Sequence, residues 1–237
     1  MRKSFYLFIC SILFSGLSHA YNPEHLAQFI ATQHCEECDL NQINLSPEIL
    51  GSDHYRGAIL YGSYFYGSTI EDLDLQSAHA QNINGVGLLL HNNELSYADF
   101  SYSDLPDLTI SPENRGYFVR FTGAGVDGGN FAYTQLDTPQ FQQASMSNAV
   151  LYHVDWPNAN LHGARLRGAD LTYAMLRGAN LTYANLSDAL LSHADLSETN
   201  LYGATVTNEQ LAKALSVCNA TLPDGSVGVC KPDRRVE

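Results

Sequence analysis

A glycine-rich segment and a set of histidines and cysteines are the residues here whose types suggest chemistry. Gly123-Ala-Gly125-Val-Asp-Gly128 matches the pattern GxGxxG. In a dinucleotide site this pattern follows a strand and opens a helix, whose first N–H groups bind the pyrophosphate. Here apolar residues continue at a spacing of five through the segment, at Phe121, Val126 and Phe131. We therefore expect no helix after the glycines and predict no nucleotide cofactor.

The histidines and cysteines form no motif that is specific for catalysis or metal binding. Neither an HExxH zinc motif nor a Gly-x-Ser-x-Gly nucleophile elbow occurs. Cys35 and Cys38 form one CxxC, with no histidine pair downstream at zinc-finger spacing and no βαβ pattern around it. We predict no catalytic residue, no metal site and no cofactor, and hence a protein that is not an enzyme.

The first 20 residues have the features of a secretory signal peptide. Arg2 and Lys3 precede an apolar run from Phe5 to Leu17, and Ser18-His-Ala20 follows with small residues at its ends. The run is shorter than the roughly 20 residues that span a bilayer. We predict cleavage after Ala20, with export to the periplasm or the medium and no stable membrane insertion. An uncleaved anchor is the alternative.

After removal of the signal peptide, which contains Cys10, four cysteines remain. An even number of cysteines favours disulfides in an exported chain. Four cysteines allow three pairings, and the two pairs lie near opposite ends of the sequence. We favour Cys35–Cys38 and Cys218–Cys230. The second pair closes a loop through the turn residues Pro223-Asp-Gly225. For the first pair, a local disulfide and two buried thiols remain alternatives.

Charge narrows the choice of partner. The formal net charge of the 237-residue chain is −13. An acidic chain is repelled by nucleic acid and by acidic membrane surfaces, so neither is predicted as a partner.

The elements that position these residues follow from a repeat of five. From Asn158 to Tyr202 the sequence reads NANLH GARLR GADLT YAMLR GANLT YANLS DALLS HADLS ETNLY. From Phe121 to Val206 the frame gives 18 central positions, all apolar, and alanine lies two residues before 12 of them. A period of five fits neither an ordinary strand nor an ordinary helix.

A second register of the same repeat precedes this one. It runs from Leu40 to Ile110, and the next centre, Phe121, follows after 11 residues instead of 10. The extra residue falls among turn-forming residues, so we expect a register break at 111–117. The earlier register is also rougher, with Gly85 at a centre. We expect a loop or bulge near 82–93 as well.

The triplets ANL, ADL and ARL, held in frame over so many units, resemble the pentapeptide-repeat family. The resemblance covers about residues 35–206, and CEECDL at the start and LPDG between two cysteines at the end also look like that family. It implies an all-β fold, a right-handed quadrilateral β-helix solenoid with four pentapeptides per turn. The 33 units then make about eight coils. The central residue and the residue two before it point inward, and a bulky side chain at the latter would overpack the tube.

Short helices are expected to cap both open ends of the solenoid. At residues 21–34, Asn22 is a good N-cap and Pro23 suits the first helical position. The C-terminal cap and Cys-closed tail are assigned to 207–237. Thr207 and Gln210 there have capping-box spacing, and three residues are expected to cover the last coil: Leu211, Ala214 and Leu215.

One outward column of aromatic residues is the candidate binding surface. Tyr133, His153, Tyr173 and His193 are 20 residues apart, each two after a centre, and should lie one above another at about 4.8 Å. Such a ladder could stack on a flat ligand, a sugar ring or a partner protein. Self-stacking that only stiffens the rod is the alternative, and we favour it.

These observations favour an exported, non-catalytic scaffold or protein-interaction module with an unidentified protein partner. The resemblance suggests a second hypothesis, an acidic mimic of DNA that binds a type II topoisomerase, but the signal peptide argues against it. It also allows a homodimer, as in some family members. A third hypothesis is a ligand site or enzyme in the irregular first half, which a deep polar pocket near 82–117 would support.

Overall fold

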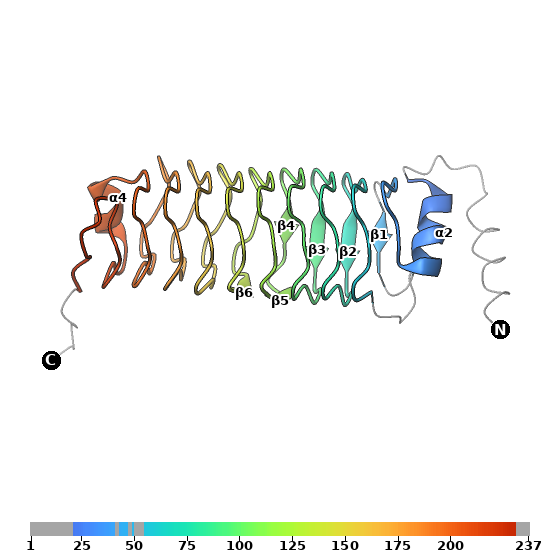
Figure 1. The fold of residues 1–237 in the computed structure, drawn as a ribbon, viewed down its shortest axis with the longest axis horizontal. Coiled ribbons are helices and arrows are strands. Elements are labelled where there is room, and N and C mark those ends of the chain that lie inside the picture. The colour runs from blue at the N-terminus through green and yellow to red at the C-terminus, as the bar shows by residue number, and fades with distance from the viewer. Residues whose placement is uncertain (1–20, 41–42, 47–48, 50–54, 231–237) are drawn as a thin grey trace.

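The chain forms an elongated rod of stacked coils (Figure 1). The computed structural model describes residues 21–40, 43–46, 49 and 55–230. Helix α2 (Pro23–Thr32) lies at one end of the rod and helix α4 (Asn208–Lys213) at the other. The predicted signal peptide lies outside the described residues.

Parallel pairing between residues 20 apart builds the coils. Asn130 pairs with Val150, Val150 with Asp170, and Asp170 with Leu190. Three further columns of pairs pass through Gln135, Gln140 and Ser145, so a coil has four sides of five residues each. Each coil is therefore bonded to the coil before it and the coil after it, as in a β-helix.

Regular strands are short because each side of a coil holds only five residues before the chain turns. Four strands form one parallel sheet in chain order: β1 (Asn44–Leu45), β2 (Thr69–Glu71), β3 (Leu89–His91) and β4 (Thr109–Ile110). Two more form a second parallel sheet: β5 (Arg115–Tyr117) and β6 (Gln135–Asp137). Most other pairings are isolated bridges.

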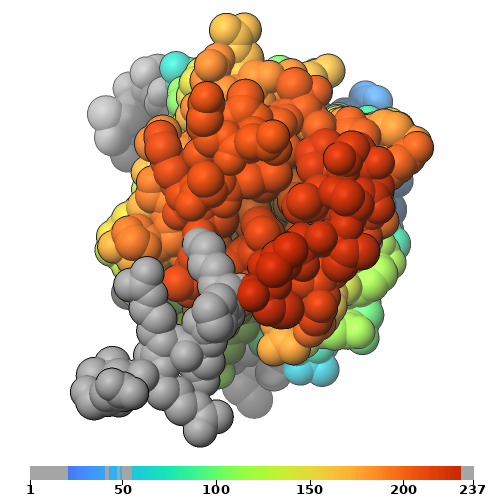
Figure 2. Space-filling view, turned by 90° about the vertical axis from the view of Figure 1, so that its left-hand side faces the viewer, coloured from blue at the N-terminus to red at the C-terminus, as the bar shows by residue number. Residues whose placement is uncertain are grey.

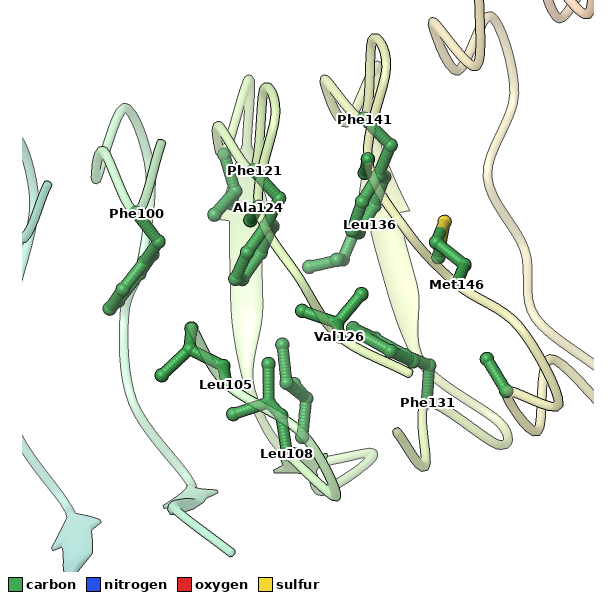
Figure 3. Close-up of a cluster of buried hydrophobic side chains, with 14 of the residues drawn as sticks. Phe100, Leu105, Leu108, Phe121, Ala124, Val126, Phe131, Leu136, Phe141 and Met146 are labelled. Carbon is green, nitrogen blue, oxygen red and sulfur yellow. The ribbon is translucent and has the colours of Figure 1, made fainter. Parts of the chain in front are cut away.

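The interior is filled by the two inward residues of each unit, as the repeat predicted. Phe100, Phe121 and Phe141, from successive coils, stack with ring centroids 5.1 and 5.0 Å apart (Figure 3). Trp156 continues the stack 5.0 Å from Phe141, and its indole N–H donates to the buried Thr134 hydroxyl. Each fully buried large apolar side chain contributes about 1.5–3 kcal/mol.

The first coil is longer than the repeat predicted. His34, Asp39 and Asn44 pair with residues 25 positions later, whereas Ile59 pairs with His79 at the usual 20. One five-residue unit more than a regular coil therefore lies between Asn44 and Ile59. The spacing of five continues through this stretch, so sequence alone could not show that one unit is additional. Part of it, at 47–48 and 50–54, lies outside the described residues.

The bulge expected near 82–93 is absent, and that prediction is wrong. Asn84 pairs with Asp104 and Leu89 with Thr109, both at the regular spacing. Leu105 fills the space that Gly85 leaves at its centre, because a Cβ added to Gly85 would lie 2.8 Å from the Leu105 Cδ2. A neighbouring coil thus compensates for the missing side chain.

The register break expected at 111–117 is present, and the strand pairing locates the extra residue within a shorter range. Glu94 pairs with Arg115 at a separation of 21, and Arg115 pairs with Gln135 at 20. The extra residue therefore lies before Arg115. Gly116 stands opposite Leu136 and is already a centre of the second register.

Buried asparagines hold the break together. The Asn114 side-chain oxygen accepts hydrogen bonds from the backbone N–H of Asn93 (2.8 Å) and from its side-chain amide (3.1 Å). The Asn114 amide donates to the carbonyl of Leu90 at 2.7 Å and to that of Ser111 at 2.9 Å. The bond to the Asn93 N–H satisfies a buried backbone donor, and the two amide bonds add to backbone hydrogen bonds that the carbonyls of Leu90 and Ser111 already accept.

Helix α4 covers the C-terminal end of the rod, which Figure 2 views end-on. Thr207 and Gln210 form both capping-box hydrogen bonds. The Gln210 amide also donates to the carbonyls of Leu186 (2.8 Å) and Ala189 (2.9 Å). At Ala189 it replaces the backbone donor that a further coil would supply, as Leu190 does for Ala169. Leu211 and Ala214 are buried, but Leu215 is 59% exposed, so its predicted place in the covering face is wrong. Leu215 follows the short helix, and its backbone N–H instead pairs with Ala194.

Neither described helix has the length and hydrophobicity that crossing a membrane requires.

Candidate functional site

The predicted aromatic column is continuous and stacked on itself. The ring centroids of Tyr133 and His153 lie 5.5 Å apart, and those of His153–Tyr173 and Tyr173–His193 lie 4.7 Å apart. The planes of neighbouring rings differ by only 9–10°. This separation matches the spacing of paired strands, so the coil repeat itself sets the stack.

Self-stacking leaves the column little capacity for a flat ligand. Both faces of His153 and of Tyr173 contact neighbouring rings. The solvent-facing parts are therefore ring edges, with phenol oxygens and imidazole nitrogens that can form hydrogen bonds. The rings stack on one another as the self-stacking alternative expects. That the column stiffens the rod, or serves as a binding surface, stays a prediction.

Tyr152 packs across the side of the column. Its ring meets Tyr133 at 5.4 Å, His153 at 4.7 Å and Tyr173 at 5.9 Å, each edge-to-face. Burial against these rings raises the pKa of the Tyr152 phenol, and Tyr133, Tyr173 and Asp170 add to the effect. The Tyr152 phenol therefore stays neutral to a higher pH than a free tyrosine does.

The backbone under the column is left-handed, which sequence reasoning did not predict. Tyr133, His153, Tyr173 and His193 have φ between 56 and 63°. Each lies at the corner where the chain turns from one side of the coil to the next. This conformation destabilises an L-residue by roughly 1–2 kcal/mol. The packing of the rings offsets that cost.

The four candidate cysteines come together in the predicted pairs. The sulfur atoms of Cys35 and Cys38 lie at disulfide-bonding distance, with a Cα–Cα distance of 5.5 Å. Those of Cys218 and Cys230 do so as well, with a Cα–Cα distance of 4.1 Å. The first pair is buried at the start of the coils and the second joins the segments after α4, so both lie beside the open ends of the rod.

A polar hollow lies at the register break, within the range where such a pocket was expected to support ligand binding. Its volume is about 420 Å³, and it is lined by Asn92, Pro112, Glu113, Asn114, Arg115 and Gln135. The lining combines one cation, one carboxylate and three amides. No periodicity identifies this hollow, because its residues come from three coils.

Glu113, one of the residues that line this hollow, belongs to a group of three side chains with His91 and Ser111. His91 Nδ1 lies 3.0 Å from the Ser111 hydroxyl oxygen and 3.7 Å from Glu113 Oε2. A hydrogen bond from Ser111, then the Glu113 backbone and His91, lower the pKa of the Glu113 carboxyl. In a Ser-His-acid triad the serine and the acid contact opposite ring nitrogens. Here both contact Nδ1, so the group is not such a triad.

A larger hollow of about 750 Å³ lies beside α4. It runs between the coil residues 187–190 and the segment 204–213, and includes Asp188, Gln210 and Lys213. It exists because a helix replaces the next coil there.

The remaining motifs behave as repeat residues. Gly123 and Gly128 occupy left-handed corner positions of regular coils, and a Cβ at Gly123 would lie 2.8 Å from the Tyr102 ring. Within the described residues, no group of three or more His, Cys, Asp or Glu side chains could hold a metal ion. Arg167 and Arg177 form ion pairs with carboxylates of the next coil, Asp188 and Glu198.

Comparison with known proteins finds the same repeat. The family model described as "Pentapeptide repeats" matches residues 144–182 and 176–208, in eight copies. No curated protein matches the chain.

Solved structures with similarity to the chain include three pentapeptide repeat proteins. HetL, involved in heterocyst differentiation regulation in the cyanobacterium Nostoc sp. strain PCC 7120, is 22% identical, with 88% of this chain and 100% of HetL covered and a TM-score of 0.36. AT2G44920, from the Arabidopsis thaliana thylakoid lumen, is 26% identical, covering 45% of this chain and 70% of that protein, at a TM-score of 0.32. Rfr23, from the cyanobacterium Cyanothece 51142, is 21% identical, and the match covers 74% of this chain and 96% of Rfr23 at a TM-score of 0.25.

Proposed function

We propose that this chain, which matches the family model of pentapeptide repeats over residues 144–182 and 176–208, is an exported, non-catalytic scaffold or protein-interaction module. In this proposal the rod is a right-handed quadrilateral helix of about eight coils, capped by α2 and α4. A solenoid of this kind offers a long, rigid outer surface, and binding to it requires no ordering of the backbone.

The observation that carries the proposal is the chemistry of that outer surface. Among the described residues, ten tyrosines are exposed along the rod: Tyr61, Tyr64, Tyr66, Tyr97, Tyr102, Tyr117, Tyr133, Tyr173, Tyr183 and Tyr202. Tyrosine is enriched at protein interfaces, because its ring contributes large contact area and its hydroxyl a hydrogen bond. Several lie near the N-terminal end of the regular coils, where Tyr61 is 45% and Tyr64 49% exposed.

Export is part of the proposal and rests on the first 20 residues. The cysteine pairs at both ends of the rod support it, since disulfides persist in oxidising compartments. Cell fractionation with N-terminal sequencing tests this directly. A mature N-terminus at Tyr21 in the periplasm or medium is expected, whereas an intact N-terminus in the cytoplasm would contradict export.

The interaction role is tested by chemical crosslinking and affinity capture from the compartment that holds the protein. The purified chain is compared with a variant carrying Tyr61→Ser and Tyr64→Ser. We expect one partner that the wild type captures saturably and the variant captures less. Repeated failure to find a partner, together with measured turnover of a substrate, would refute the proposal. Light scattering in the same buffers reports whether that partner is a second copy of this chain.

The acidic charge supports a second candidate, a mimic of DNA that binds a type II topoisomerase. The net charge of −13 is carried on an elongated rod, which suits a surface that normally holds DNA. A supercoiling assay with the mature protein decides: inhibition supports this candidate, and normal supercoiling at large excess removes it.

A further inference from the structure

Arg115 supplies the positive charge of the hollow at the register break. Its side chain forms no ion pair or hydrogen bond within the part of the chain that the structure describes. Four other arginines each pair with a carboxylate, in the pairs Arg56–Asp74, Arg120–Asp99, Arg167–Asp188 and Arg177–Glu198. The guanidinium of Arg115 is thus available for a carboxylate that this chain does not provide.

The strand around Arg115 directs it outward. In β5, Arg115 and Tyr117 are exposed and Gly116 between them is half-buried and faces inward. The partner strand β6 places Gln135 beside Arg115, and Gln135 is exposed as well. A guanidinium and a neighbouring amide can together donate several parallel hydrogen bonds to one carboxylate group.

The lining of the hollow also includes an acidic group. Glu113 lines it and stays ionised, because Ser111 donates to its carboxylate. Asn92, also in the lining, donates to Asp72 at 2.6 Å, which brings a second carboxylate close to the hollow. Glu113 and Arg115 form no ion pair with each other, although both line the same space. The lining of the hollow therefore holds both a cation that can bind a carboxylate and a carboxylate that can bind an ammonium.

From this arrangement we propose that the hollow binds a small zwitterion, an amino acid or short peptide with a free ammonium and a free carboxylate. Arg115 and Gln135 bind the carboxylate, and Glu113 binds the ammonium. A volume of about 420 Å³ lies within the range of small-molecule sites. A zwitterion has no net charge, so the acidic chain does not repel it as it would an anion.

The proposal is independent of the interaction role and is tested with the full chain and three matched probes. These are alanyl-alanine, N-acetyl-alanyl-alanine and alanyl-alanine methyl ester, titrated by calorimetry and by chemical-shift mapping. We expect saturable binding of alanyl-alanine and binding at least about tenfold weaker for each blocked probe. The shifts should centre on 92 and 113–135.

Charge-removing variants assign each end of the probe. Arg115→Gln should abolish the preference for the free carboxylate over the methyl ester, and Glu113→Gln the preference for the free amine over the acetylated probe. Arg165→Gln is the matched control, since Arg165 contacts Ser145 on another side of the coil, and it should leave binding unchanged. Thermal melts confirm that each variant is folded. Equal binding of all three probes, no saturable binding up to about 10 mM, or an Arg115→Gln variant that binds like wild type would overturn the proposal.

Discussion

Replacing Tyr173 tests whether its left-handed backbone and ring stacking have the energies inferred above. Tyr173 has φ of 61° and stacks between His153 and His193 at 4.7 Å on each side. Aromatic pairs contribute about 0.5–1.5 kcal/mol each beyond their buried area. Because Tyr173 is 40% exposed, we expect Tyr173→Ala to lower the free energy of unfolding by about 1–3 kcal/mol.

The glycine variant at the same position separates the two contributions. Tyr173→Gly loses the same ring contacts as Tyr173→Ala. It also relieves the strain of the left-handed backbone, which is about 1–2 kcal/mol for an L-residue. Against this, glycine gains about 0.5–1 kcal/mol of backbone freedom in the unfolded chain. The net expectation is that Tyr173→Gly is more stable than Tyr173→Ala by about 0.5–1 kcal/mol.

Urea denaturation of both variants beside the wild type measures the difference. Ala169→Gly is the control, since Ala169 is buried and has an ordinary negative φ, so glycine should destabilise there by about 1 kcal/mol. An alanine variant at 173 that equals or exceeds the glycine variant in stability would refute the inferred strain.

Further predictions concern the core, a surface carboxylate and the C-terminal cap. Phe121→Ala should destabilise by about 3–5 kcal/mol and Phe121→Leu by much less, because Phe121 is fully buried between stacked rings; similar urea midpoints for the two would contradict the packing. Burial alone would raise the pKa of Asp99, but hydrogen bonds from Ser101 and Gln81, and Arg120, hold it below its usual value. A folded-state pKa below the unfolded one means stability that is present at neutral pH and lost as pH falls through the folded pKa. Asp99→Asn should therefore lower the melting temperature at pH 7 and no longer do so near pH 2, and a pH-independent effect would argue against this origin. Gln210→Ala should cost about 1–3 kcal/mol and speed hydrogen exchange in the last coils only, because it removes the donor to the Ala189 carbonyl and one of the two donors to the Leu186 carbonyl; unchanged exchange there would show that the amide is dispensable.

Much of the fold was predictable because the inward positions form a local pattern. A central leucine with alanine two residues earlier identifies which side chains face the core without reference to other coils. The same frame placed Tyr133, His153, Tyr173 and His193 in one column, and 11-residue spacing revealed the register break. The two cysteine pairs followed from their positions near opposite ends of the chain.

What the pattern missed depends on contacts between coils. The regular path through 82–93 relies on Leu105 of the next coil filling the space at Gly85. The 25-residue first coil keeps the spacing of five, so only the pairing of His34 with Ile59 reveals the additional unit. In each case the deciding partner is about one coil away in sequence.

The sequence by itself determined the repeat, the inward residues and the outward columns, since these depend on a period of five within one chain segment. The tertiary structure decided how the columns are used. In the aromatic column both faces of the inner rings contact neighbouring rings and are not open to a flat ligand, because the coil spacing brings successive rings to a stacking distance of 4.7 Å. Only the stacking of three coils around one extra residue brings Asn92, Glu113, Arg115 and Gln135 to a common hollow.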